Sequence, residues 1–251
     1  MSTFFSQIKI LKKLGAVAIK QSLEDEGANF EEIRFLRKIT KKYGLKLNVK
    51  VGGCEAKNDI YFCQSIKCDG IVVPMVESEY NLTKFIQTVS NEFKGDLYMN
   101  LESINGFKNL SKIINTNEFK KIKGVVVGRS DLVGSLKLDK SKVNSKKIFN
   151  LVKNGLRKIK RKKKLVKIGG NLTVKSKNFL SKLFSEKLID RAETRNFEFR
   201  INKYALRNFD MIINLIFKFE IEWLKYKNMN FVSNSYAKRE NKKRIDVVFK
   251  R

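Results

Sequence analysis

The chain of 251 residues carries 54 Lys and Arg against 25 Asp and Glu, together with one Pro, three Cys and no His, for a formal net charge of +29. The absence of His excludes Ser-His-Asp and Cys-His catalytic relays and His-bound zinc, so acid–base or metal chemistry must use carboxylates, Lys, Tyr or Cys. With 42% hydrophobic residues the chain can bury a substantial core, at a length that α/β barrels commonly fill as one domain.

The positive charge is concentrated in the second half of the chain. Residues 1–125 hold 20 Lys and Arg and 14 Asp and Glu, whereas residues 126–251 hold 34 and 11. Lysines that neutralise phosphates would supply sequence-independent affinity for nucleic acid. The abundance of Lys, Asn, Ile and Phe is also what AT-rich codons produce, and we favour this second interpretation. No recognition motif for a specific nucleic acid is present, so we expect no such partner.

Signals for export or membrane insertion are missing from the sequence. The first 20 residues are interrupted by lysines, and the most apolar stretch, Phe209 to Leu224, contains several charged residues. The three cysteines have neither CxxC spacing nor a His that could complete a zinc site. We expect a soluble cytoplasmic protein with reduced thiols and no membrane partner.

Short apolar runs alternate with longer amphipathic segments from residue 16 onward. Asn29 and Glu32 make a capping box for the first amphipathic helix, which ends at Gly44. A long helix is expected from Tyr204 to Tyr226. The apolar runs predict seven strands, at 16–19, 47–51, 70–75, 97–101, 124–127, 165–168 and 192–199.

Sustained strand–helix alternation predicts a parallel α/β sheet, and right-handed crossovers repeated seven or eight times close most economically into a (β/α)8 TIM-like barrel. Its eighth strand is expected to be incomplete or atypical. An open doubly wound sheet is the alternative, weakened because no GxGxxG or GxxxxGK[ST] motif follows any strand. We assign residues 1–227 to the barrel and residues 228–251 to a basic C-terminal tail.

Two carboxylates follow neighbouring predicted strands. Glu102 comes directly after the run at 97–101, and Asp131 lies four residues after the run at 124–127. In a (β/α)8 barrel the active site lies at the carboxyl ends of the strands, so both acids could reach one ion. Two carboxylates with water and substrate oxygens form the usual environment of Mg²⁺ or Mn²⁺. The sequence therefore predicts a divalent-metal site on Glu102 and Asp131.

Three stretches, residues 68–78, 101–110 and 124–132, resemble the HpcH/HpaI aldolase and citrate lyase family in motif order and spacing. The resemblance implies a (β/α)8 barrel that makes or breaks carbon–carbon bonds through a metal-bound enolate of pyruvate or of an acyl-CoA. It implies that Glu102 and Asp131 are the ligands of Mg²⁺ or Mn²⁺. It also places Gly128, Arg129 and Ser130 at the substrate.

Departures from the family pattern concern the catalytic groups. Lys50 stands where the family usually has a substrate-binding arginine, so the charge is kept but the bidentate fork is lost. The pyruvate-aldolase branch uses a histidine as acid–base, and this chain has none. The segment Leu23-Glu24-Asp25 is similar to an element of the citrate lyase branch. We therefore assign catalysis to Lys50, Glu24 and Asp25, with Glu26 or metal-bound water as other proton carriers.

The resulting hypothesis is a divalent-metal-dependent carbon–carbon lyase, aldolase-like or citrate lyase-like, acting on a small anionic 2-oxo acid or acyl-CoA. The family resemblance also implies a homo-oligomer. The alternative is a catalytically altered barrel or a basic binding protein without lyase activity. Two further features stay open: Glu193-Thr194-Arg195 is either a strand-end site element or an ion pair, and the basic run 157–164 is either a solvated helix end or an attractor of anionic substrate.

Overall fold

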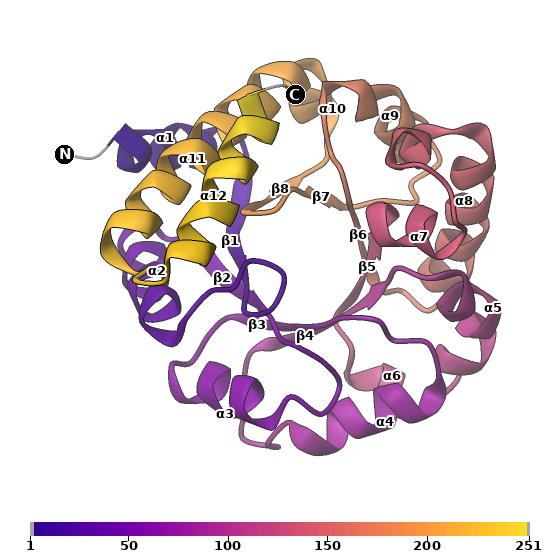
Figure 1. Ribbon diagram of the computed structural model, residues 1–251. Coiled ribbons are helices and arrows are strands. Elements are labelled where there is room, and N and C mark those ends of the chain that lie inside the picture. Colours follow the sequence, from indigo (N-terminus) through magenta and orange to yellow (C-terminus); the bar gives the residue numbers. More distant parts are fainter. Residues whose placement is uncertain (1–2, 250–251) are drawn as a thin grey trace.

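The computed structural model describes residues 3–249, and its strands form a closed eight-stranded barrel ringed by helices (Figure 1). The fold expected from the strand–helix alternation is confirmed. The strands are β1 (Ala16–Ser22), β2 (Lys46–Lys50), β3 (Gly70–Val73), β4 (Asp96–Leu101), β5 (Gly124–Gly128), β6 (Leu165–Gly169), β7 (Arg191–Glu193) and β8 (Phe197–Arg200).

Helices connect the strands and cover the outside of the barrel. The α-helices are α1 (Thr3–Lys13), α2 (Phe30–Tyr43), α3 (Lys57–Ser65), α4 (Glu79–Thr88), α5 (Ile104–Ile113), α6 (Glu118–Lys121), α7 (Arg129–Ser135), α8 (Lys146–Arg161), α9 (Lys177–Ser185), α10 (Lys203–Arg207), α11 (Phe209–Asn230) and α12 (Ser235–Phe249). Two 3₁₀ turns, η1 (Lys140–Asn144) and η2 (Val174–Ser176), precede α8 and α9. None of the helices within residues 3–249 combines the length and apolar character that crossing a bilayer requires.

Helix boundaries follow the local capping chemistry. Asn29 accepts a hydrogen bond from the backbone N–H of Glu32 at 2.8 Å, which satisfies one free donor at the start of α2. The same helix ends at Gly44, whose φ of 63° lies in the left-handed region that closes helices. Ser78 and Ser103 cap α4 and α5 in the same way as Asn29 caps α2. These caps fix where each of the three helices begins.

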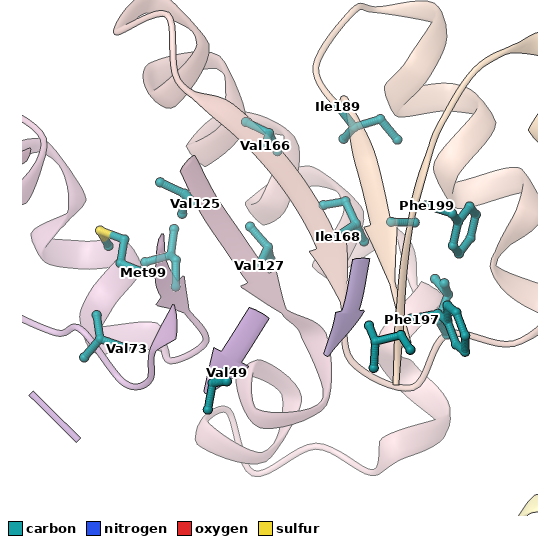
Figure 2. Close-up of a cluster of buried hydrophobic side chains, with 14 of the residues drawn as sticks. Val49, Val73, Met99, Val125, Val127, Val166, Ile168, Ile189, Phe197 and Phe199 are labelled. Atoms are coloured by element: carbon teal, nitrogen blue, oxygen red, sulfur yellow. The ribbon is translucent and has the colours of Figure 1, made fainter. Parts of the chain in front are cut away.

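Apolar side chains of the strands pack outward against the helices. Val49, Met99, Val127 and Ile168 lie on four parallel strands and are fully buried, and Figure 2 shows them among other buried apolar side chains of the barrel. The runs Gly70–Val73 and Gly124–Gly128 are apolar throughout because both faces of these strands are buried. The inner face of the barrel, in contrast, carries many polar side chains.

The eighth strand departs from the (β/α)8 pattern. We expected one strand over residues 192–199, but the chain reverses at Thr194, and β8 runs antiparallel to both β7 and β1. The backbone N–H of Thr194 donates to the carbonyl of Phe197 at 2.8 Å, and the N–H of Phe197 donates back to Thr194 Oγ1 at 3.2 Å. The barrel is therefore closed by a hairpin rather than by a helical crossover, which confirms an atypical eighth strand.

The reversed strand places a charged cluster inside the barrel. Glu198 on β8 is fully buried and accepts a hydrogen bond from Lys167 Nζ at 2.5 Å, another from Asn48 Nδ2 at 2.8 Å, and one from Arg191. The ammonium of Lys167 also lies 3.4 Å from the ring centroid of Tyr98. These charged side chains occupy the interior of the barrel, where (β/α)8 barrels usually hold layers of branched apolar side chains.

The C-terminal segment is helical and contacts the barrel. The expected boundary at residue 227 falls inside α11, which continues to Asn230, and α12 covers most of the expected basic tail. Figure 1 shows α12 in yellow alongside α11. Arg244 of α12 donates to Glu26 Oε2 at 3.0 Å, and Lys227 donates to the carbonyl of Glu26 at 2.8 Å. Both helices thus hold the loop between β1 and α2.

Candidate active site

The mouth of the barrel contains a polar cavity of about 290 Å³ at the carboxyl ends of the parallel strands. Strand residues lining it come from six strands. They are Lys20 and Ser22 of β1, Lys50 of β2, Asn100 of β4, Val126 and Gly128 of β5, Gly169 of β6 and Glu193 of β7. The cavity is also lined by Glu102 and Asp131, the two predicted metal ligands.

Glu102 follows β4 and is held from two sides. Its side chain is 3% exposed; Oε1 accepts the backbone N–H of Met75 at 3.1 Å and Oε2 accepts Asn100 Nδ2 at 2.9 Å. Met75 has a φ of 50°, an uncommon value for a residue with a side chain, and such strained positions cluster at functional sites. The backbone after β3 is therefore shaped to donate to Glu102, a role that the residue pattern did not predict.

Asp131 lies in the first turn of α7, directly after β5. Its charge acts on Glu102: burial raises the pKa of the Glu102 carboxyl, Lys50 opposes that rise, and Asp131 adds to it. The structure thus places both predicted ligands in the lining of one cavity, close enough for the charge of Asp131 to disfavour ionisation of Glu102. A cation between them would relieve the repulsion.

Lys50, at the end of β2, supplies the positive charge of this part of the cavity. Its ammonium pairs with Asp25 and lies 3.9 Å from Glu102 Oε1. Burial disfavours its charged form, but Glu102, Asp25 and Asp131 outweigh that effect and raise the Lys50 pKa. Lys50 therefore stays protonated at neutral pH, as expected of a group that replaces an arginine.

The loop between β1 and α2 contains three consecutive acidic residues, Glu24, Asp25 and Glu26, and only the last two line the cavity. Asp25 reaches Lys50, and Glu26 lines the cavity but accepts from Arg195 Nη1 at 3.3 Å and from Arg244. Glu24 is exposed and packs beside Gly52, outside the cavity lining. Of the two loop residues predicted to be catalytic, the structure places Asp25 at the site and Glu24 beside it.

Of the three predicted substrate-binding residues, only two lie at the cavity. Gly128 and Ser130 line the cavity, whereas the Arg129 side chain points away from it and is fully buried. Its guanidinium donates to the carbonyls of Gly169 at 3.0 Å and Gly170 at 3.1 Å and lies 4.7 Å from the Phe179 ring centroid. Burial lowers the Arg129 pKa to about 9. Arg129 therefore fixes the loop after β6 instead of facing the cavity.

A second ion pair lies on the wall formed by β1 and β7. Lys20 Nζ donates to Glu193 Oε1 at 2.5 Å, and the Glu193 side chain is 2% exposed. The other oxygen of Glu193, Oε2, is buried and has no hydrogen-bond partner within residues 3–249. Two interpretations of Glu193 were left open, an ion pair and a strand-end site element. The structure shows the ion pair, and it places Glu193 among the residues that line the cavity.

The donor set at the mouth suits a hard divalent cation. Glu102 and Asp131 offer carboxylate oxygens, and Asn100 Oδ1 is buried without a hydrogen-bond partner in the described part of the chain. No group of three or more acidic or Cys side chains placed to hold a metal occurs among residues 3–249. Mg²⁺ typically takes one or two protein carboxylates and completes its octahedron with water and substrate oxygens, so these residues fit it.

Sequence comparison decides the family. The model of the HpcH/HpaI aldolase/citrate lyase family matches residues 28–168, which is more than half of the chain and includes Lys50, Glu102 and Asp131. The chain belongs to the HpcH/HpaI aldolase/citrate lyase family. Membership supports a carbon–carbon lyase-type function. Comparison with curated proteins gave no match.

Solved structures show the same fold at low sequence identity. The HpcH/HpaI aldolase from Desulfitobacterium hafniense DCB-2 has a TM-score of 0.64 at 12% identity, covering 84% of this chain and 86% of its own. A family protein from Burkholderia cenocepacia J2315 has a TM-score of 0.62 at 14% identity, with coverages of 77% and 84%. Citrate synthase SbnG has a TM-score of 0.59 at 14% identity, with coverages of 72% and 80%.

Proposed function

We propose that this HpcH/HpaI family protein makes or breaks a carbon–carbon bond next to the carbonyl of a small anionic 2-oxo acid, with Mg²⁺ or Mn²⁺ held by Glu102 and Asp131. The observation that carries the proposal is the placement of these two carboxylates and buried Lys50 around one polar cavity. An acyl-CoA is the other substrate class that the family implies. A cavity of about 290 Å³ favours the smaller 2-oxo acid.

Different groups at the cavity would bind the substrate and stabilise the negative charge of the enolate. The metal, when bound, supplies Lewis-acid polarisation of the substrate carbonyl. Lys50 adds a fixed positive charge where negative charge develops as the enolate forms, and its buried position makes that charge more effective than it would be in water. Gly128 and Ser130 shape the wall beside Asp131, where the substrate carboxylate would lie.

Proton transfer needs a group other than histidine, and Glu193 is the best placed. Asp25 is engaged by Lys50, Glu26 is engaged by two arginines, and Glu24 lies outside the cavity lining. Glu193 lines the cavity, its buried Oε2 has no hydrogen-bond partner among residues 3–249, and Lys20 holds its other oxygen, Oε1. We assign Glu193 as the acid–base group, with Lys20 as its positioning residue.

Isothermal titration with oxalate, a stable mimic of a pyruvate enolate, tests the proposed site. We expect saturable oxalate binding at one site per chain that requires Mg²⁺ or Mn²⁺, because the cation links the Glu102 and Asp131 carboxylates to the anion. Metal-independent binding, or no binding at millimolar oxalate with either metal, would show that this barrel is not a metal-dependent lyase.

Glu193→Gln separates proton transfer from substrate binding. The amide keeps the size of the side chain and cannot take a proton, so we expect turnover to fall by about a hundredfold or more, the usual contribution of a general base. Oxalate affinity should stay within about threefold, since the metal and Lys50 are unchanged. Glu31→Gln, at an exposed carboxylate on α2, is the control. Equal turnover of both variants would exclude Glu193 as the base.

A further inference from the structure

The opposite end of the barrel carries a second, larger cavity. It has a volume of about 880 Å³ and is bounded by the amino ends of β4 to β7 and by the segment that follows β8. These elements occupy one side of the ring in Figure 1, from α6 to α10. We call this hollow the basal basin. It shares no lining residue with the cavity at the mouth.

Cations dominate the lining of the basal basin. Eight Lys and Arg side chains line it against two carboxylates, Asp96 and Asp190. The cations are Lys120, Lys121, Lys123, Lys160, Lys163, Lys164, Arg191 and Arg200. Only Lys160 and Arg191 of these eight form ion pairs with carboxylates among residues 3–249, with Asp190 and Glu198 respectively. Six cations converge on the hollow without a carboxylate partner in the described chain.

The fold holds several of these cations close enough to repel one another. Arg191 and Arg200 lie directly opposite each other in the β7–β8 pair, an arrangement of like charges that destabilises a sheet. Burial and the nearby charge of Lys123 both lower the Lys164 pKa. The reversed direction of β8 is what brings Arg200 to this end of the barrel. A bound polyanion would remove the repulsion that the isolated chain carries.

The loops that present the cations are held in place. Lys164 donates to the carbonyl of Lys120 at 2.9 Å, which joins the loop before β6 to the end of α6. Lys160 donates to both oxygens of Asp190, at 2.8 and 2.9 Å, and Asp190 also accepts the backbone N–H of Val166 at 2.7 Å. The basin is therefore a preformed site, and binding an anion there requires little ordering of backbone.

We propose that the basal basin binds a compact polyphosphate anion, such as the phosphate chain of a nucleoside triphosphate. Several unpaired cations around one hollow match several linked phosphate groups, since each lysine neutralises a phosphate as a point charge. A carboxylate neutralises part of the basic surface on neighbouring α8. In the adjoining hollow, Glu186 pairs with Lys153 at 2.6 Å and with Arg157 at 2.9 Å.

Tripolyphosphate is the probe for this proposal, measured by isothermal titration at constant ionic strength. We expect one site per chain, affinity more than about tenfold higher than that of orthophosphate, and no displacement by oxalate with Mg²⁺. Lys121→Gln combined with Lys123→Gln should weaken tripolyphosphate binding by at least about tenfold. Lys146→Gln combined with Lys147→Gln removes the same charge from exposed positions at the start of α8 and is the matched control.

The outcomes separate a built site from a generally basic surface. Equal weakening in the two double variants, or no saturable tripolyphosphate binding, would overturn the proposal. A single-stranded oligonucleotide that binds more tightly than tripolyphosphate and is affected alike by both variants would identify a diffuse nucleic-acid surface instead. Competition by oxalate would place the anion at the mouth, and would overturn the basal site while leaving the lyase proposal intact.

Discussion

Glu102→Gln should lower metal-dependent turnover by about a thousandfold or more and abolish metal-dependent oxalate binding, because it removes one of two anionic ligands and part of the charge that retains the cation. The variant should still fold. Asn100 Oδ1 has no other partner in the described chain, so the Asn100 amide can turn and accept from the new Gln amide. Asp131→Asn should cause the same loss of turnover and of oxalate binding. Because Asp131 is exposed, this substitution disturbs no buried charge.

Two measurements distinguish this result from general damage. Urea unfolding should give the Glu102→Gln protein a stability within about 1 kcal/mol of the parent, since the hydrogen bonds of Glu102 are retained. Glu31→Gln should leave turnover and oxalate binding unchanged. If the Glu102→Gln and Asp131→Asn proteins both turned over at the parent rate, the metal assignment would be wrong.

Glu198→Gln should cost about 3–5 kcal/mol of unfolding free energy, the largest stability effect that we expect from a conservative substitution in this chain. Glu198 is fully buried and is the carboxylate that pairs with both Lys167 and Arg191. Removing its charge leaves the fully buried Lys167 ammonium without a counterion. Equilibrium urea unfolding measures the cost. Glu186→Gln, which breaks two surface ion pairs, should cost far less than Glu198→Gln.

The pH dependence of stability provides an independent check on Glu198. Burial alone would raise its pKa, but Lys167 and Arg191 outweigh burial and hold the pKa below the usual value of 4.5. A depressed pKa stabilises the folded protein above the unfolded-state value and loses that contribution as the pH falls through the lower folded-state value. The parent should therefore lose stability on acidification below about pH 4.5. The part of that loss due to Glu198 should be missing in Glu198→Gln. An equal acid dependence in both proteins, or a cost below about 1 kcal/mol, would contradict this account of the barrel interior.

The first six strands could be predicted because their residues carry a local signal. Apolar runs such as Gly70–Val73 and Gly124–Gly128 are buried on both faces, and polar residues interrupt the chain where each run ends. The positions of Glu102 and Asp131 at the barrel mouth could be predicted for the same reason, since both lie within three residues of the carboxyl end of a parallel strand.

The reversal at β8 and the orientation of Arg129 lacked such a signal. The turn at Thr194-Arg195-Asn196 contains no Gly or Pro, the residues that usually mark a reversal in a sequence. It is closed by a backbone hydrogen bond and by the Thr194 side chain, which no local pattern announces. Arg129 is drawn inward by carbonyls about forty residues later, at Gly169 and Gly170, and by the Phe179 ring. Long-range contacts of this kind are invisible to motif spacing, which placed Arg129 at the substrate.

The reversal of β8 also explains where part of the positive charge in the second half of the chain is located. Three lysines of the basic run 157–164, Lys160, Lys163 and Lys164, line the basal basin together with Arg200 of the reversed strand. These lysines lie at the end of the barrel opposite Glu102, so they do not contribute to the mouth cavity.

Exchange of the pyruvate methyl protons with D₂O, followed by proton NMR, tests enolate formation without knowledge of the second substrate. The arrangement of Glu102, Asp131, Lys50 and Glu193 predicts exchange that requires Mg²⁺ or Mn²⁺, rises in proportion to protein concentration and is lost in Glu102→Gln. Exchange no faster than in buffer with metal alone, or exchange that persists unchanged in Glu102→Gln, would contradict the assignment of this barrel as a metal-dependent lyase of 2-oxo acids.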